Sequence, residues 1–277
     1  MPTARLSQDD RRRIGAELRE LRDLAGRTLE DAAARLGCSP AKVSRIETGQ
    51  VAVRPLDLRE LLDMYEVSGA RRTALLSVGQ HGRQRWWKEY ADLIYGGYDL
   101  YIGYEDEATE IWEYQPQWIP GLLQTHAYAQ ALGEAFGRPA EVAARWADLR
   151  QARQAMLLRE NPPAVSVVVD DSALLRASAP GVMRDQLRQL VAAGGNPHVS
   201  VQVLPASAGM HPGQAGGFIV LGFADPNDPR VAYTNNLTEG HLIREPEHVA
   251  EYVSVFGRLR ELALTPAESL DFIRRIV

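Results

Sequence analysis

The chain has 277 residues, of which 45% are hydrophobic and 24% charged, and its formal net charge is −5. This length favours two domains, and the composition is typical of a soluble globular protein rather than a disordered one. No run of about 18 apolar residues suggests a membrane span, and the N-terminus lacks the apolar core of a signal peptide. A single cysteine, Cys38, excludes an intramolecular disulfide and a cysteine-based zinc cluster. These features predict a cytoplasmic protein that is not bound to a membrane.

The first predicted element is an amphipathic helix over residues 9–25. Its apolar face consists of Ile14, Leu18, Leu21 and Leu24, which recur at spacings of three and four. Three arginines at its start, residues 11–13, could approach a DNA backbone or form a solvated cluster of charge.

Residues 28–37 predict a short second helix that ends in a tight turn. Apolar residues recur from Leu29 to Leu36 at helical spacing, and Thr28 can cap the helix N-terminus. Ala33 is small enough to allow the next helix to approach closely. Gly37 can adopt the left-handed backbone of the turn without strain.

A third helix follows at once and ends at Gly49. Ser39 can cap it, and Pro40 is tolerated in its first turn. Val43 and Ile46 form a single apolar edge, so the opposite face is free to enter a DNA groove. The combination of Ala33, Gly37, Val43 and Ile46 favours a DNA-binding helix-turn-helix over a generic helical hairpin.

The sequence from residue 15 to 49, GAELRELRDLAGRTLEDAAARLGCSPAKVSRIETG, resembles the Cro/repressor-like, or Xre-type, helix-turn-helix regulators. The resemblance implies a lambda-repressor-like domain of five helices that binds double-stranded operator DNA. It also implies a structural ion pair between Glu47 and Arg22. Leu29 occupies a position where many members carry a phosphate-contacting glutamine. The DNA-binding residues expected are Thr28, Ser39, Ala41, Lys42, Ser44, Arg45 and Arg54, of which Lys42 and Arg54 would contact phosphates.

Two further helices, residues 56–65 and 70–78, complete this predicted domain of residues 1–80. The polar stretch 79–84 predicts the boundary to a second domain of residues 81–277. The first domain carries 14 lysines and arginines against 12 acidic residues, and the second carries 17 against 24. Because the first domain is only mildly basic, specific contacts or dimerisation must supply much of the DNA affinity.

The second domain begins with a stretch that is rich in aromatic residues. Four of the five tryptophans lie between residues 85 and 121, which favours a packed core but also fits an interface or a ligand pocket. A glycine-rich loop at 209–217 lacks a P-loop lysine and is expected to cover a pocket rather than bind phosphate. The candidate residues for a ligand or partner are Trp86, Trp87, Trp112, Trp118, Tyr128 and His211.

A second resemblance rests on WIPGLLQTHAYAQA at 118–131, RWW at 85–87, the pattern at 105–111 and TPAESLDFI at 265–273. Together these motifs look like actinobacterial regulators that join a helix-turn-helix to a domain of unknown function, DUF5753, including Scr1-type and WhiJ-like proteins. The resemblance implies an antitoxin-like pairing with a small DUF397-type or BldB-like protein.

The rest of the second domain predicts a mixed α+β fold with a small, largely antiparallel sheet. Residues 165–169 are four valines and Ser166, a run typical of a buried strand. We expect the strands 199–204, 218–223 and 230–234 to form an antiparallel meander beside it. Helices are predicted at residues 139–160, 181–193, 247–263 and 266–276, the last capped by Thr265.

No catalytic motif is evident in the sequence. Asp170 and Asp171 follow a buried strand, where acidic residues could bind a metal or act as a base, but a helix start is the preferred interpretation. The six histidines lack metal-ligand spacing with a carboxylate. We therefore expect no metal, no cofactor and no enzymatic activity, with an enzyme fused to a DNA-binding module as the rival hypothesis.

The functional prediction is a homodimeric, sequence-specific transcriptional regulator. A single reading helix per chain needs two-fold doubling to reach an adequate operator length. The second domain is expected to bind a small partner protein, and the alternative is that it senses a small molecule.

Overall fold

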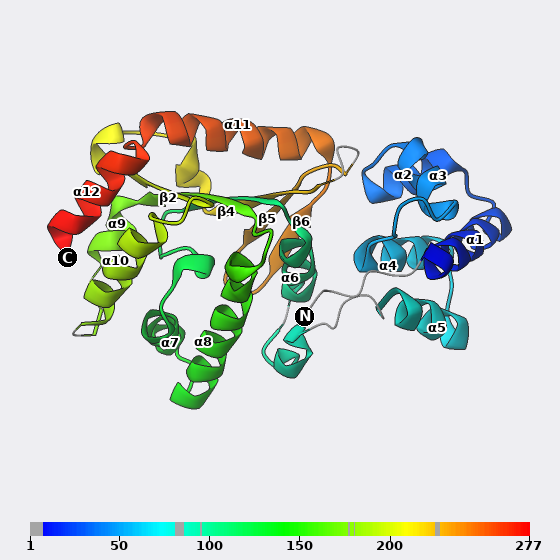
Figure 1. The fold of residues 1–277 in the computed structure, drawn as a ribbon, viewed down its shortest axis with the longest axis horizontal. Helices are drawn as coiled ribbons and strands as arrows, with labels where there is room; N and C mark the ends of the chain where they lie inside the picture. Colours follow the sequence, from blue (N-terminus) through cyan, green and yellow to red (C-terminus); the bar gives the residue numbers. More distant parts are fainter. Residues whose placement is uncertain (1–7, 81–85, 95, 177, 180, 225–227) are drawn as a thin grey trace. The chain divides into compact units, whose positions relative to one another are not determined.

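The computed structural model describes residues 8–80, 86–94, 96–176, 178–179, 181–224 and 228–277. The chain divides into two compact units, residues 1–88 with 225–229 and residues 89–224 with 230–277, and Figure 1 shows their helices and strands. The predicted domain boundary at residue 80 adjoins residues 81–85, which lie outside the described part of the chain.

The first unit contains five described α-helices, as the sequence predicts. They are α1 (Gln8–Leu24), α2 (Leu29–Leu36), α3 (Pro40–Glu47), α4 (Pro55–Met64) and α5 (Gly69–Gln80). A 3-10 helix, η1 (Trp86–Tyr90), follows the stretch that is not described.

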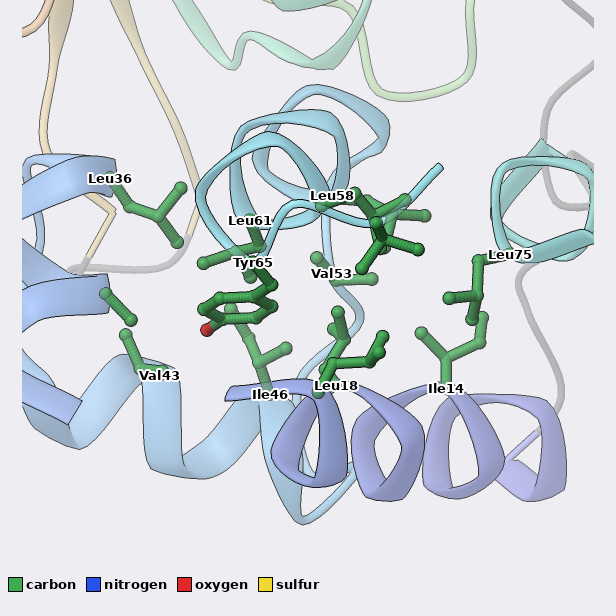
Figure 2. Packing of buried hydrophobic residues seen from close by; sticks show 14 of the residues in the cluster. Ile14, Leu18, Leu36, Val43, Ile46, Val53, Leu58, Leu61, Tyr65 and Leu75 are labelled. Atoms are coloured by element: carbon green, nitrogen blue, oxygen red, sulfur yellow. The ribbon is translucent and has the colours of Figure 1, made fainter. Parts of the chain in front are cut away.

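Side chains from all five of these helices and from the segments between them form one apolar core (Figure 2). Ile14 and Leu18 of α1 and Val43 and Ile46 of α3 belong to this core, and each of these four side chains is at most 2% exposed. Burial of one such side chain contributes about 1.5–3 kcal/mol, so this core fixes the position of α3. Its remaining labelled members are Leu36, Val53, Leu58, Leu61, Tyr65 and Leu75.

The second unit is built on a six-stranded mixed sheet with the strand order β3-β2-β1-β4-β5-β6. The strands are β1 (Glu110–Gln115), β2 (Ala164–Asp170), β3 (Val199–Leu204), β4 (Phe218–Gly222), β5 (Val231–Asn235) and β6 (Gly240–Ile243). β1, β2 and β3 pair in parallel, whereas β4, β5 and β6 continue the sheet from β1 in antiparallel order. The predicted α+β class with a mostly antiparallel sheet is therefore confirmed.

The predicted meander of three strands is wrong in one respect. The strand at 199–204 does not pair with β4 but lies parallel to β2, with Val165 opposite Val199. The physical reason is the helix α10 (Val182–Ala193), which carries the chain back across the sheet, because parallel neighbours need such a crossover. Two strands, β1 and β6, were not predicted.

The helices of this unit lie on both faces of the sheet. In Figure 1, α11 (Pro246–Leu262) runs along one face, and α6 (Tyr98–Glu107), α7 (His126–Ala135) and α8 (Ala140–Gln154) lie on the other. Successive side chains of β1 point to opposite faces of the sheet. Trp112 stacks on Phe256 of α11, with ring centroids 5.6 Å apart, whereas the neighbouring Glu113 belongs to the opposite face. The predicted helix 139–160 ends earlier, as α8 followed by the 3-10 helix η3 (Ala155–Leu158).

The short α9 (Asp171–Leu175) and the last helix, α12 (Pro266–Ile276), complete the unit. α12 begins at a capping box formed by Thr265 and Glu268, which confirms the predicted cap. Ser269 of α12 accepts a hydrogen bond from the backbone nitrogen of Val203 at 2.8 Å. This contact covers part of the open edge of β3, a position that would otherwise invite another strand. Among the described residues, no helix is long and apolar enough to cross a membrane.

Candidate functional site

The first candidate site is the helix-turn-helix formed by α2 and α3. Thr28 and Asp31 form a reciprocal capping box at the start of α2, with hydrogen bonds of 3.0 and 2.9 Å. The hydrogen bond that the backbone nitrogen of Thr28 donates to the Asp31 carboxylate, together with the Thr28 side chain, lowers the pKa of Asp31. Gly37 ends α2 in the left-handed conformation, with φ of 63°, which a side chain would disfavour. The motif is therefore defined by local sequence at each of its ends.

The recognition helix α3 begins at Ser39, whose Oγ accepts a hydrogen bond from the backbone nitrogen of Lys42 at 3.3 Å. Its apolar edge, Val43 and Ile46, is at most 1% exposed. Ser39 and Ala41 are exposed, and Ser44 and Arg45 are half-buried, along the rest of the helix surface. The expected base-contacting residues therefore all keep some solvent-accessible surface.

The two expected phosphate contacts have a different environment. The side chain of Lys42 is buried, and its Nζ lies 3.4 Å from Oδ2 of Asp57 on α4. A phosphate contact by Lys42 would require its ammonium group to exchange this carboxylate for DNA. Arg54 precedes α4 as its N-cap residue and is half-buried.

A buried ion pair joins α1 to α3. Arg22 donates hydrogen bonds to Glu47 from Nε at 2.7 Å and from Nη2 at 3.1 Å. The hydrogen bond from Arg22 to Glu47 raises the pKa of the guanidinium. Burial also raises the pKa of the neighbouring Tyr65 hydroxyl. The expected pairing of Arg22 and Glu47 is present, and both charges serve the fold rather than the DNA surface.

Two glycines, Gly15 and Gly49, let the backbones of α1 and the α3 region approach each other. The sequence motifs indicated Gly49 only as the end of the third helix and indicated no role for Gly15. A Cβ at Gly15 would lie 2.3 Å from the carbonyl oxygen of Ile46 and 2.6 Å from that of Glu47. A Cβ at Gly49, where φ is +70°, would lie 2.6 Å from the Cα of Arg12. The seven-residue spacing from Gly15 to Arg22 could have indicated that Gly15 faces α3, because residues two helical turns apart lie on the same face of a helix.

The six ligand or partner candidates of the second domain do not gather at one place. Trp86 and Trp87 pack edge to face in η1, and Trp112 lies between Phe256 and the guanidinium of Arg230. These three rings therefore have packing contacts, and Trp112 lies in different surroundings from the other two.

The other three candidates also differ. The hydroxyl of Tyr128 is buried and accepts a hydrogen bond from the backbone nitrogen of Ile119. His211 packs edge to face against Tyr114, ahead of the 3-10 helix η5 (Pro212–Ala215) in the glycine-rich loop. Trp118 lines a pocket.

That pocket has a volume of about 450 Å³ and lies within the second unit. It is enclosed by residues of α6, α7 and α8 and of the hairpin formed by β5 and β6. Besides Trp118, its walls include Tyr98, Phe136, Trp146 and Tyr233 as aromatic side chains, Arg138 and Arg150 as cations, Asn235 and Asn236 as amides, and Glu239. Trp146 and Arg150 sit four residues apart on one face of α8, a spacing that could have indicated a shared surface.

A buried polar network lies next to the pocket. Arg153 of α8 donates to Glu105 of α6 from Nε at 2.7 Å and from Nη2 at 2.6 Å, and from Nη1 to the hydroxyl of Tyr98 at 2.7 Å. Burial disfavours the charge on Arg153, but attraction to Glu105 outweighs it, so the pKa of Arg153 is raised well above its ordinary value. Tyr98 thus connects the pocket wall to this network.

Gly121 of the PGLLQT motif lies against the same arginines. A Cβ at this position would be 2.6 Å from Nη1 of Arg150 and 3.0 Å from Nη1 of Arg153. The 3-10 helix that contains it, η2 (Gly121–Leu123), is buried. The glycine of this motif therefore makes room for two guanidinium groups.

The acidic residues after β2 serve the backbone. Asp170 caps α9 by accepting from the nitrogen of Ser172 at 3.0 Å, which confirms the preferred interpretation as a helix start. Asp171 accepts from the nitrogen of Ala206 at 2.8 Å. Within the described part of the chain, no group of three or more histidine, cysteine or acidic side chains is arranged to hold a metal ion.

Comparison with known families matches both units. Residues 13–75 match the model of a helix-turn-helix domain, and residues 98–275 match a domain of unknown function, DUF5753. No curated protein and no solved structure matches the chain. The helix-turn-helix supports a DNA-binding regulator, and the predicted combination of a helix-turn-helix with a C-terminal DUF5753 domain is confirmed. The chain belongs to the DUF5753 family and carries a helix-turn-helix domain ahead of the family domain.

Proposed function

We propose that this protein is a sequence-specific transcriptional regulator that reads operator DNA with the exposed surface of α3. The observation that carries this proposal is the asymmetry of α3: one edge is buried against α1, and the other presents Ser39, Ala41, Ser44 and Arg45. A helix fixed on one side and accessible on the other is the arrangement that enters a major groove.

The regulator acts as a homodimer in this proposal. One α3 contacts only a few base pairs, and a two-fold pair of such helices spans two half-sites about 34–36 Å apart. The modest positive charge of residues 1–80 supports the same inference, because weak non-specific attraction must be compensated by a larger specific interface.

The second unit controls DNA binding, and its pocket supports a small-molecule effector as the controlling ligand. A volume of about 450 Å³ lies in the roughly 300–1,000 Å³ range of small-molecule sites, which also combine apolar walls with a few polar groups. We propose no catalytic role, because Asp170 and Asp171 are engaged by backbone nitrogens.

A small DUF397-type or BldB-like protein is the second candidate for the controlling partner. It is supported by the family resemblance. The exposed large apolar side chains of this unit include Leu158, Leu175, Met210 and Leu237. They come from separate elements, and apolar residues scattered singly are ordinary on a protein surface. The geometry therefore favours the small molecule, and we propose the cytoplasm, with the nucleoid when DNA is bound, as the site of action.

The test of the proposed function is a footprint of the purified chain on the DNA upstream of its own gene, with the molecular mass measured in the same buffer. A protected inverted repeat together with a dimeric mass supports a symmetric regulator. Protection of a single half-site by a monomer contradicts the homodimer. Absence of protection, from a chain whose circular dichroism shows the folded helices, contradicts control of its own gene.

A further inference from the structure

We propose that the pocket between α6, α7, α8 and the β5–β6 hairpin binds a small amphipathic organic acid, with a flat apolar body between the aromatic walls and the acidic group at Arg150. This inference rests on the proposed role of the second unit as a small-molecule sensor, and it names the chemical class of the effector.

The aromatic walls define the body of the ligand. Trp118 and Phe136 pack edge to face with ring centroids 6.1 Å apart, and the ring centroids of Tyr98 and Trp146, which also line the pocket, are 5.7 Å apart. Rings held in this way are rigid and present flat apolar surfaces at little cost in side-chain entropy. A planar or ring-shaped apolar group is the shape that such walls accommodate.

Arg150 defines the acidic group. It lines the pocket from α8 and is half-buried. Among the described residues no carboxylate lies within ion-pair distance of Arg150, whereas its neighbour Arg153 is matched by Glu105 at 2.6 Å. Arg150 acts on the buried carboxyl group of Glu113 through its charge but forms no ion pair with it. A partly desolvated guanidinium that is not held in an ion pair favours an anionic ligand, which it can bind through two parallel hydrogen bonds.

The charges around the pocket favour an anion over a cation. Arg138 is a second cation in the lining, and its guanidinium carbon lies 4.2 Å above the ring of Trp146. Glu239 is the one acidic residue among the described lining residues, and its Oε2 is 3.8 Å from Nε2 of His241. The two arginines therefore outweigh the single acidic side chain.

Asn236 in the hairpin is a poor binding partner for a ligand ammonium group. Oδ1 of Asn236 already accepts from the nitrogens of Thr238 and Glu239, at 2.9 and 2.8 Å. Its acceptor is thus occupied by the turn, so a ligand ammonium group gains little there. Arg150, which lines the pocket from α8, is the group that can distinguish an acid from its neutral amide.

The test measures binding to the full chain in the absence of DNA. The fluorescent probe 8-anilinonaphthalene-1-sulfonate is bound first, and it is then displaced by 1-naphthylacetate or by its neutral counterpart, 1-naphthylacetamide. Both competitors have the same aromatic body, so the ratio of their displacing concentrations reports the recognition of the acid. We expect the acetate to displace the probe at about ten-fold lower concentration, as a charged hydrogen-bonded pair implies.

Four variants assign the effect to the pocket. Arg150→Gln reduces the ratio to near one, and Arg150→Lys retains most of it. Arg145→Gln, on the same helix but paired with Asp92, leaves the ratio unchanged. Trp118→Ala weakens both competitors to a similar degree, and thermal unfolding checks that each variant is folded.

Other outcomes overturn the proposal. They are no probe binding, equal displacement by acid and amide in the wild-type chain, or an acid preference that survives Arg150→Gln. Because no DNA is present, each result is independent of operator binding, and the footprint decides the proposed regulatory function separately.

Discussion

Arg22 and Glu47, twenty-five residues apart in sequence, are joined by two buried hydrogen bonds of 2.7 and 3.1 Å. The pair fastens α1 to the end of α3 at the edge of the apolar core. A bidentate pair of this kind is geometrically specific, so it fixes the orientation of the reading helix as well as its distance. The charges are therefore part of the scaffold that presents Arg45 and Ser44.

Replacement of one partner leaves the other charge buried without compensation. We expect Arg22→Met to lower the free energy of unfolding by about 3–5 kcal/mol, because an isolated buried carboxylate is strongly disfavoured. Urea denaturation monitored by circular dichroism measures the loss. The double variant Arg22→Met with Glu47→Leu should recover most of it, since no charge is then stranded. A single variant as stable as the wild type would show that the pair contributes little.

Gly15 provides a second test of the contact between α1 and α3. We expect Gly15→Ala to destabilise the protein by about 1–3 kcal/mol, as an overpacked interior does, because the new Cβ would meet two backbone carbonyl oxygens. Gly257, in the middle of α11, is the matched control, since a Cβ there meets nothing within 4 Å. Gly257→Ala should stabilise its helix by up to about 1 kcal/mol. Equal effects of the two substitutions on the urea midpoint would contradict the close approach.

The reading surface is tested at Arg45. Arg45→Ala should weaken binding to a footprinted operator roughly ten-fold or more, as loss of a contact worth about 1–3 kcal/mol implies. Arg71→Ala is the control, because Arg71 lies on α5 and pairs with Glu17 and Glu20. Binding is measured by fluorescence anisotropy at fixed salt, with thermal unfolding of both variants. If Arg45→Ala binds as tightly as Arg71→Ala, the assigned reading surface is wrong.

The helix-turn-helix was predictable because its signals are local. A cap such as Thr28, a left-handed glycine such as Gly37 and the apolar spacing of Val43 and Ile46 each depend on neighbouring residues. The close approach at Gly15 depends on α3, thirty residues further on, and only a packed structure reveals which helical glycine has a neighbour. From the sequence alone, Gly15 and Gly257 are both simply glycines within a helix.

The sheet was harder to predict for a related reason. The run at 165–169 is apolar on both faces and reads as a buried strand, but β1 mixes Trp112 and Tyr114 with Glu113. Apolar and polar residues alternate over these three positions, but the polar residue Glu113 faces a buried network rather than solvent. The usual pattern of a half-buried strand is therefore hard to recognise in this aromatic-rich stretch. The pocket escaped prediction similarly, since Trp146 and Arg150 come from α8, and Tyr233 comes from a strand almost ninety positions away.

Glu113 gives a prediction with a defined pH dependence. Its side chain is buried on β1, where Nε2 of Gln115 donates to it at 3.1 Å. Burial raises its pKa from 4.5 to about 7, although the nearby Arg153 acts in the opposite direction. Below pH 4.5 the carboxyl group is protonated in both the folded and the unfolded chain, so it does not affect stability there.

Between pH 4.5 and about 7 the unfolded chain releases the proton while the folded chain retains it, so the contribution of Glu113 to stability falls as the pH rises. Above pH 7 the full cost is present, on the order of 3 kcal/mol. Glu113→Gln keeps the shape of the side chain and an acceptor for Gln115 but does not titrate. We expect the variant to be more stable than the wild type at pH 8, with the difference shrinking toward pH 5. Urea denaturation at both values measures it, and a difference that is the same at pH 5 and pH 8 would show that the carboxyl group is charged in the fold throughout.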